Sequence, residues 1–224
     1  MDGQHEGIDL GELRYLVVEG PIGVGKTSLA KRLAETLSSE LILERAEENP
    51  FLERSYRNRR YAALPTQLFF LLQRARQIEQ LRQSDMFSPV RVADFLIEKD
   101  RLFAELNLDA SELRLYEEVA ATLDLEVPKP DLVIYLQAPA HILMKRVAAR
   151  AAPYEQFIDL DYLERLGEAY ARFFYNYESA PLLIVNATSI DPIHRESDYQ
   201  ELLRTIARVK RGRHFFNPAA VALA

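Results

Sequence analysis

A glycine-rich run that directly follows a short apolar stretch constrains this chain more than any other feature of its sequence. Residues 20–27 read Gly-Pro-Ile-Gly-Val-Gly-Lys-Thr and satisfy the pattern G-x-x-x-x-G-K-[ST]. The apolar stretch 15–19 before it is typical of a buried strand, and residues 25–38 after it have the period of an amphipathic helix. A strand, a glycine turn and a helix in this order predict a loop that cradles phosphate groups at a helix amino terminus.

Each residue type in this loop has a predicted task. Glycines let backbone N–H groups turn toward the phosphates, Lys26 brings a mobile positive charge to the group in transfer, and Thr27 offers its hydroxyl to Mg²⁺. The flanking strand and helix argue against a chance glycine turn. The residues predicted to bind ATP are Gly20, Pro21, Ile22, Gly23, Val24, Gly25, Lys26, Thr27 and Ser28.

Short apolar runs alternate with long amphipathic stretches along the rest of the chain, which predicts a parallel sheet covered by helices. The expected fold is α/β, a P-loop three-layer sandwich with a five-stranded parallel sheet. Residues 1–12 and 210–224 are expected to be a flexible amino terminus and a carboxy-terminal tail around one domain, 13–209. The expected strands are 15–19, 41–44, 90–94, 132–137 and 182–186, and the expected helices are 25–38, 66–83, 98–108, 111–125, 139–149, 160–178 and 195–209.

Composition argues against several classes of protein. The formal net charge of −6 disfavours a non-specific nucleic-acid binder, whose affinity rests on an excess of Lys and Arg. The absence of cysteine rules out disulfides and thiolate chemistry and fits a reducing compartment. The first residues do not resemble a signal peptide, and no window approaches the length of a membrane span. A cytoplasmic protein without a membrane partner is therefore expected.

Two acidic residues stand where predicted strands end, and open α/β sheets bind ligands at those carboxyl ends. Glu44 ends the strand expected at 41–44, and Asp94 ends the one expected at 90–94. An enzyme that transfers a phosphoryl group to a hydroxyl uses one carboxylate as base and another beside the metal. We therefore predict Glu44 as the base and Asp94 as the metal residue; the alternative is that either one caps the following helix.

The helix expected at 66–83 is apolar nearly all round in its first half, so it should be largely buried. Gln67 and Arg74 lie two turns apart on one of its faces. Buried amide and guanidinium groups need partners, and a nucleobase or a sugar would supply them. The alternative is that Gln67 caps a neighbouring loop and Arg74 reaches solvent; periodicity alone does not choose between the two.

Basic residues gather at the end of the helix expected at 139–149. Arg146 and Arg150 are four apart on one face, and Pro153 then ends the helix. Such a segment, around 145–158, is typical of a lid whose arginines neutralise phosphate charge while closure excludes water. The alternative is that the cations simply complement the helix dipole.

Taken in order, these motifs resemble the deoxynucleoside kinases, particularly the bacterial deoxyadenosine and deoxyguanosine kinases, from about Arg14 to Val209. The resemblance implies the nucleoside/nucleotide kinase version of the fold, ATP as phosphoryl donor, Mg²⁺, a small-molecule deoxynucleoside as acceptor and usually a homodimer. The pieces that carry it are Glu-Gly-Pro-Ile-Gly-Val-Gly-Lys-Thr at 19–27, Glu44, Asn-Pro-Phe-Leu at 49–52, Tyr56, Gln67, Arg74, Val-Ala-Asp at 92–94 and the lid with its trailing Glu155.

By this resemblance, Glu44 would act at the nucleoside 5′-hydroxyl and Asp94 would lie beside Mg²⁺. Tyr56 and Glu155 would hold the 3′-hydroxyl. Gln67 would read the edge of the nucleobase, with Arg74 nearby and Asp100 assisting. At the donor end of the site, Arg146 and Arg150 would join Lys26 at the ATP phosphates.

The chain departs from the family pattern at two positions. Many relatives follow the strand-end acid with Arg, whereas Phe95 stands there in this chain. The lid often carries a third Arg where this chain has Ala152, so Arg146 and Arg150 must suffice or another residue must contribute.

The leading prediction is ATP-dependent 5′-phosphorylation of a deoxynucleoside, with deoxyadenosine or deoxyguanosine or both as the expected acceptors, for nucleotide salvage. A nucleoside monophosphate kinase similar to thymidylate kinase is a second possibility, for which Arg74 could meet the acceptor phosphate. A non-catalytic P-loop regulator is a third, although it would lack a hydroxyl-directed base and a base-reading pocket. The sequence leaves the preferred base, feedback by a deoxynucleoside triphosphate and the role of the tail open.

Overall fold

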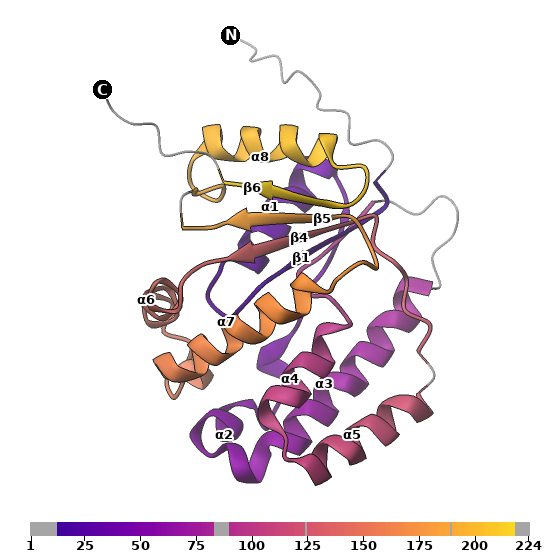
Figure 1. Ribbon diagram of the computed structural model, residues 1–224, viewed down its shortest axis with the longest axis vertical. Helices are drawn as coiled ribbons and strands as arrows, with labels where there is room; N and C mark the ends of the chain where they lie inside the picture. The colour runs from indigo at the N-terminus through magenta and orange to yellow at the C-terminus, as the bar shows by residue number, and fades with distance from the viewer. Residues whose placement is uncertain (1–12, 83–89, 124, 189, 218–224) are drawn as a thin grey trace.

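The strands of this computed structural model, which describes residues 13–82, 90–123, 125–188 and 190–217, form one parallel sheet in the order β2-β3-β1-β4-β5-β6. The central strand β1 lies between β3 and β4, so the strand order reverses beside it and a crevice for ligands opens at its carboxyl end. The strands are β1 Tyr15–Glu19, β2 Glu40–Ile42, β3 Arg91–Ala93, β4 Leu132–Gln137, β5 Leu182–Asn186 and β6 Arg213–Phe216 (Figure 1).

Helices cover the sheet and extend beyond its carboxyl edge. In Figure 1, α1 lies behind the sheet and α7 in front of it, which confirms the predicted three-layer α/β architecture. The helices are α1 Lys26–Leu37, α2 Leu52–Arg57, α3 Arg59–Arg82, α4 Lys99–Asn107, α5 Ala110–Thr122, α6 Ala140–Arg150, α7 Leu160–Tyr175 and α8 Glu196–Arg208, with 3-10 turns η1 Ala46–Glu48 and η2 Pro153–Glu155.

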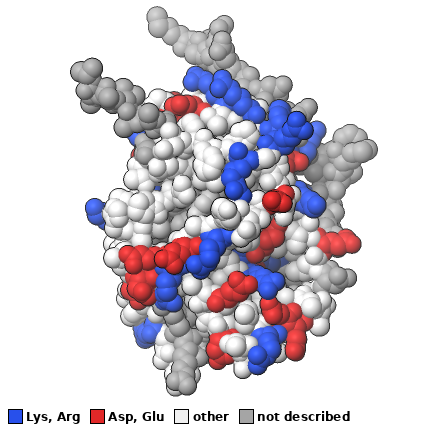
Figure 2. Space-filling model, in the orientation of Figure 1, with Lys and Arg blue, Asp and Glu red and all other residues white. Residues whose placement is uncertain are grey.

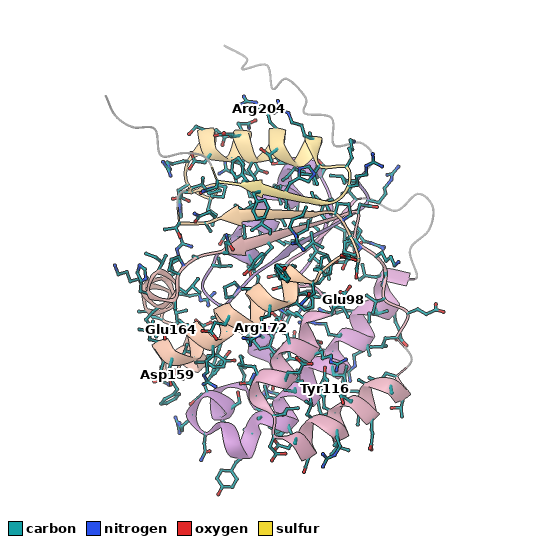
Figure 3. The ribbon with its side chains drawn as sticks, viewed as in Figure 1. Glu98, Tyr116, Asp159, Glu164, Arg172 and Arg204 are labelled. Atoms are coloured by element: carbon teal, nitrogen blue, oxygen red, sulfur yellow. The ribbon has the colours of Figure 1, made fainter. Side chains whose placement is uncertain are left out.

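The core forms where the central strands meet α7. Strands β1 and β4 are apolar and buried on both faces, as strands of a helix-covered parallel sheet must be. Asp159 caps α7 by accepting a hydrogen bond from the Tyr162 N–H at 2.7 Å, and Figure 3 shows Asp159 at that end of the helix. The buried face of α7 then presents Phe174, whose ring stacks on Tyr135 of β4 with centroids 4.1 Å apart. This packing fixes the sheet against α7, the helix that follows the lid segment 145–158.

The predicted number of strands was wrong by one. Within the described residues the sheet has six strands, because Arg213–Phe216 pairs in parallel with β5. These residues lie in the segment expected to be a tail; the expected flexible terminus 1–12 and residues 218–224 lie outside the described residues. An edge strand is exposed along one side, and only Phe216 of β6 is buried, so the strand has no apolar pattern to reveal it.

Helix α3 begins earlier than its predicted start at residue 66, and Pro65 lies inside it. An interior proline removes one backbone hydrogen bond and ordinarily interrupts a helix. Here Ala62 and Ala63 are buried ahead of the proline, and the Thr66 hydroxyl donates to the Ala62 carbonyl at 2.7 Å. Packing of this first segment therefore outweighs the local cost of Pro65.

The surface carries both signs of charge. On the face shown in Figure 2, Lys and Arg side chains are interspersed with Asp and Glu side chains among uncharged residues. Among the described residues, no helix combines the length and the apolar character that a membrane crossing requires.

Candidate functional site

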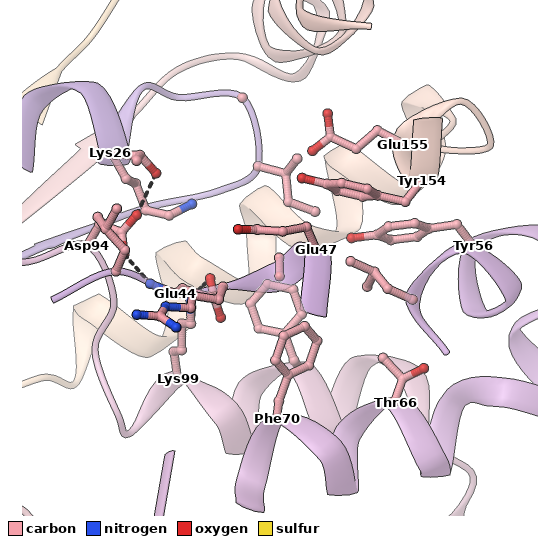
Figure 4. A pocket seen from close by; sticks show the side chains of 18 of the residues that line it. Lys26, Glu44, Glu47, Tyr56, Thr66, Phe70, Asp94, Lys99, Tyr154 and Glu155 are labelled. Carbon is pink, nitrogen blue, oxygen red and sulfur yellow. Dashed lines mark hydrogen bonds and ion pairs between the residues drawn. The ribbon is translucent and has the colours of Figure 1, made fainter. Parts of the chain in front are cut away.

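A cavity of about 580 Å³ opens at the carboxyl ends of β1, β2 and β3. Figure 4 shows Lys26, Asp94, Glu44 and Lys99 gathered toward one side of it and Tyr56, Tyr154 and Glu155 toward the other. Predicted site residues that line the cavity are Ile22, Gly23, Lys26, Thr27, Ser28, Glu44, Tyr56, Gln67, Asp94, Asp100, Arg150 and Glu155. The topology thus brings together residues that lie more than a hundred positions apart in the sequence.

The glycine loop connects β1 to α1 in backbone conformations that side chains disfavour. Gly20 has φ +151° and Gly25, the residue before α1, has φ +104°. Within the described residues no side chain caps the amino terminus of α1, so its first N–H groups are available to an anion. The loop therefore has the backbone geometry of a phosphate cradle.

Gly20→Ala is expected to destabilise the protein and to abolish ATP turnover. A Cβ at this position would lie 2.3 Å from the Leu136 carbonyl oxygen, at a φ of +151° that alanine rarely adopts. The matched control is Gly167→Ala in α7, where a Cβ would meet nothing within 4 Å and alanine favours the helix. Thermal melts should show a lower Tm for the first variant and an equal or higher Tm for the second. A Gly20→Ala protein with unchanged Tm and turnover would contradict the crowding described here.

Lys26 lies at the start of α1, half-buried, with its Nζ 3.4 Å from the Pro21 carbonyl. Burial, reinforced by repulsion from Lys99, lowers the pKa of Lys26, while Glu19, Glu44 and Asp94 oppose the shift. A bound polyphosphate would supply the negative charge that this ammonium group needs.

Asp94 ties the phosphate loop to the segment that carries Glu44. Its Oδ2 accepts a hydrogen bond from the Thr27 hydroxyl at 2.5 Å, and its Oδ1 accepts one from the Glu44 backbone N–H at 2.6 Å. Helix α4 begins only at Lys99, so Asp94 does not cap it. The strands end earlier than expected, so Glu44 lies two residues after β2 and Asp94 directly follows β3, but both residues still lie at the carboxyl edge of the sheet.

The Glu44 carboxylate projects into the cavity between cations. Arg74 donates to its Oε1, and Lys99 Nζ lies 2.9 Å from its Oε2. Burial alone would raise the pKa of this carboxyl, but Lys99, Arg74 and Lys26 outweigh it and hold the pKa of Glu44 well below its usual range. Glu44 is thus an anion fixed in direction, with a fifth of its side chain still open to the cavity.

Arg74 is fully buried and makes its contacts within the protein. Besides Glu44, its guanidinium donates to Asp100 Oδ1 at 3.3 Å and Gln77 Oε1 at 2.9 Å. The alternative that Arg74 reaches solvent is therefore wrong, while its role near a nucleobase stays a prediction. Its guanidinium carbon lies 4.0 Å from the centre of the Phe95 ring, which gives this buried aromatic residue a packing role.

The far end of the cavity is built by α2 and the lid. Glu155 is buried and pairs with Arg150, whose Nε donates to it at 3.0 Å. Burial raises the pKa of the Tyr56 hydroxyl well above its usual value, with Tyr162 and Glu155 adding to the effect. Tyr56 is therefore a neutral hydroxyl beside a carboxylate, an arrangement that suits a ligand hydroxyl.

Gln67 and Asp100 form a polar edge on an otherwise aromatic wall that includes Phe70 and Phe103. Both polar residues are buried. Burial raises the pKa of Asp100, although Arg74 and Lys99 oppose it. Its Oδ2 has no hydrogen-bond partner among the described residues, so a ligand donor would satisfy it.

Arg146 lies away from the cavity lining in this structure. Its guanidinium donates to the carbonyls of Val24 at 3.2 Å and Ala187 at 2.8 Å, so it joins the glycine loop to the end of β5. Its predicted contact with phosphates, like that of Arg150, stays a prediction.

The sequence patterns missed Lys99, Tyr154 and Glu47, which line the cavity, and gave no role to Glu19, which is buried behind it. Lys99 precedes Asp100 at the start of α4, and a lysine at a helix start is ordinarily exposed. Only the fold places it beside Glu44.

A phosphate cradle after the central strand of a parallel sheet, facing an ionised carboxylate across a cavity, defines this chain as a P-loop kinase. The chain matches the deoxynucleoside kinase family model over residues 16–210 and therefore belongs to the deoxynucleoside kinase family. It is accordingly a phosphotransferase, and the family match does not favour a monophosphate kinase or a non-catalytic regulator.

Individual relatives resemble the chain along most of its length. A deoxyguanosine kinase of Bacillus subtilis is 33% identical over 84% of this chain and 93% of its own length. A deoxyadenosine kinase of Lactobacillus acidophilus is 29% identical over 87% of this chain and 95% of its own length. A solved deoxyadenosine kinase from M. mycoides with dCMP and dCDP shares the fold, with a TM-score of 0.76 at 21% identity over 87% of this chain and 100% of that one.

Proposed function

We propose that this enzyme transfers the terminal phosphoryl group of ATP to the 5′-hydroxyl of a deoxynucleoside, with deoxyadenosine or deoxyguanosine preferred, in nucleotide salvage. The observation that carries the proposal is the Glu44 carboxylate, held by Arg74 and Lys99 on the cavity wall across from the phosphate loop. The relatives named for deoxyguanosine and deoxyadenosine support a purine acceptor.

In the proposed reaction, the acceptor 5′-oxygen forms a bond to the terminal phosphorus as the bond from that phosphorus to the β-phosphate oxygen breaks. The hydroxyl proton passes to Glu44, and ADP leaves. Lys26 neutralises the transferring group, and Arg146 and Arg150 are proposed to assist when the lid closes. A carboxylate with a depressed pKa orients the hydroxyl throughout and takes the proton late, which suits a loose transition state.

Thr27 and Asp94 are the proposed residues for Mg²⁺. Their hydroxyl and carboxylate oxygens lie together and are hard ligands of the kind Mg²⁺ prefers, and the ion needs few protein ligands when phosphates and water complete its shell. Within the described residues no group of three or more His, Cys, Asp or Glu could hold a metal, which fits an ion carried in with ATP. When bound, the ion would neutralise phosphate charge.

Acceptor selection is proposed to rest on the two ends of the cavity. Tyr56 and Glu155 would hold the 3′-hydroxyl, since a neutral phenol and a buried carboxylate offer it both a donor and an acceptor. Gln67 and the unpartnered Oδ2 of Asp100 would read the base edge, and the aromatic wall would stack on its face. Arg74 would act on the base through Asp100.

The experiment is a coupled ATP assay across the four deoxynucleosides, their ribose counterparts and their monophosphates. We expect deoxyadenosine or deoxyguanosine to give the highest kcat/KM, about tenfold or more above its ribose counterpart, and no turnover of monophosphates. The blank is Lys26→Met prepared in parallel, which should show no turnover. Equal rates with and without every deoxynucleoside, or a preference for a monophosphate, would overturn the proposal.

We also propose a cytoplasmic homodimer that binds neither nucleic acid nor membrane. The lack of cysteine and the net charge of −6 support the compartment and the small-molecule partner. Exposed Leu72 of α3 and Leu115 of α5 support association through these helices. Light scattering that gives a monomer mass at micromolar concentration would refute the dimer.

A further inference from the structure

We propose that Lys99 is a positioning residue for phosphoryl transfer. Its buried ammonium group, held in place by Glu19, binds one oxygen of Glu44 and so orients this carboxylate toward the acceptor hydroxyl. The proposal rests on the function proposed above. It assigns a task in the chemical step to a cation that the sequence patterns did not single out.

The first observation is the place of the ammonium group. Lys99 begins α4 and is only 3% exposed, yet it is one of the residues that line the cavity. Nζ lies 2.9 Å from Glu44 Oε2 and 3.6 Å from Glu19 Oε2. A lysine is rarely buried unless it is paired, and this one lies between carboxylates of β1 and of the loop after β2.

The second observation is that Glu19 is itself immobilised from several sides. Its Oε1 accepts hydrogen bonds from the Gly20 N–H at 2.7 Å and the Tyr170 hydroxyl at 2.9 Å. Its Oε2 accepts one from the Leu96 N–H at 2.6 Å. Glu19 is fully buried and directly precedes the phosphate loop, so it fixes Lys99 relative to the donor site.

The third observation is that two cations bind different oxygens of the Glu44 carboxylate. Arg74, from α3, holds Oε1 and also binds Asp100, so it relates the carboxylate to the base end of the cavity. Lys99, from α4, holds Oε2 and relates the carboxylate to the phosphate loop through Glu19. Removing Lys99 would leave one oxygen tied and the carboxylate free to turn toward Lys26 or solvent.

The positive charge of Lys99 does not by itself distinguish a positioning residue from a purely structural one. Burial favours the neutral amine, but Glu19 and Glu44 outweigh it and raise the pKa of Lys99, so the cation stays charged. A structural cation would stabilise the fold without bearing on the chemical step. Measurement of kcat separately from KM and Tm distinguishes these two tasks.

The test compares Lys99→Met and Lys99→Arg with wild type, using saturating ATP and the best deoxynucleoside. We expect Lys99→Met to lower kcat about 10²-fold, as misplacement of a reacting group by about an ångström does. KM for both substrates should stay within about threefold, since neither substrate touches Nζ in this proposal. Lys99→Arg, which restores a donor to Glu44, should recover kcat to within about tenfold of wild type.

The matched control is Leu102→Ala, a buried apolar truncation on the same helix that lowers Tm but touches no carboxylate. Its kcat should stay within about twofold of wild type. If Lys99→Met keeps wild-type kcat, or if both variants lose kcat in proportion to Tm, Lys99 is structural and the proposal is overturned.

Should Lys99→Met fail to fold, Glu19→Gln keeps the shape of the brace and one accepting oxygen but removes its charge and its second acceptor. We expect about a tenfold loss of kcat with KM for ATP unchanged, and an undiminished kcat would equally overturn the proposal. Wild type is measured in the same assay. Its inactivity toward every deoxynucleoside would refute the proposed function itself, whereas an active wild type with an equally active variant would refute only the role of Lys99.

Discussion

Replacing Glu44 by Gln lowers kcat by about 10²- to 10⁴-fold, the range expected for loss of a general base. The amide keeps the shape of the side chain and can still accept from Lys99, but it cannot take the proton of the acceptor hydroxyl. KM for ATP and for the deoxynucleoside should stay within about threefold, because the base acts chiefly in the transition state. Steady-state kinetics and direct binding of each ligand measure the two effects separately.

The same residue sets an expectation for pH. Despite burial, which favours protonation, Lys99, Arg74 and Lys26 hold the pKa of Glu44 below its usual range, so the carboxylate is charged at neutral and mildly acid pH. Between about pH 8 and 5, kcat should therefore show no loss from protonation of Glu44. A fall in kcat with an apparent pKa near 6 that disappears in Glu44→Gln would contradict this.

The control for Glu44→Gln is Glu53→Gln on α2, an exposed carboxylate paired with Arg57 at 3.0 Å. Its kcat should stay within about twofold of wild type, because exposed ion pairs contribute little. Full turnover by Glu44→Gln itself would show that another group is the base.

Arg74→Met is expected to lower the free energy of unfolding by about 3–5 kcal/mol at neutral pH. The guanidinium is fully buried, and its removal leaves Glu44 and Asp100 without their shared cation. Chemical denaturation measures the loss. The control is Arg172→Met on α7, whose side chain is 71% exposed and 3.8 Å from Glu168, and for which about 0.5 kcal/mol or less is expected (Figure 3).

The sign of the pH dependence follows from linkage. Arg74 helps to lower the pKa of Glu44, and a depressed pKa contributes stability that is present above the unfolded value and lost as pH falls through the folded one. The difference between wild type and Arg74→Met should therefore persist from neutrality down to about pH 4, the unfolded carboxyl value, and shrink as pH falls further. A difference that stays constant from pH 7 to about 3 would mean that the loss comes from packing on Phe95 rather than from charge.

The strands that build the centre of the sheet could be predicted to the residue. The expected ranges 15–19, 132–137 and 182–186 coincide with β1, β4 and β5, because strands buried on both faces read as unbroken apolar runs. The phosphate loop was equally evident, since its backbone requires glycines at fixed spacing. Local signals therefore suffice where one segment alone determines the geometry.

Residues whose neighbours come from distant segments could be predicted only in part. Glu44 and Asp94 were found because strand ends converge in every parallel sheet. Lys99 and Glu19 were not, because their contacts depend on how α4 packs beside β1, and neither residue type nor spacing records that. For Arg74, periodicity left burial and solvent exposure as alternatives, and it did not indicate that carboxylates of the protein would surround the guanidinium.

Strand β6 also covers the outer hydrogen-bonding edge of β5. Its backbone pairs with residues 182–185 of β5, and its exposed residues include Arg213 and His214. A chain that stopped at Val209 would present the bare N–H and C=O groups of β5, an apolar strand, to other molecules. Such an edge recruits further strands and promotes aggregation, whereas a short basic edge repels them. The last strand therefore protects this edge of the sheet from pairing with strands of other molecules.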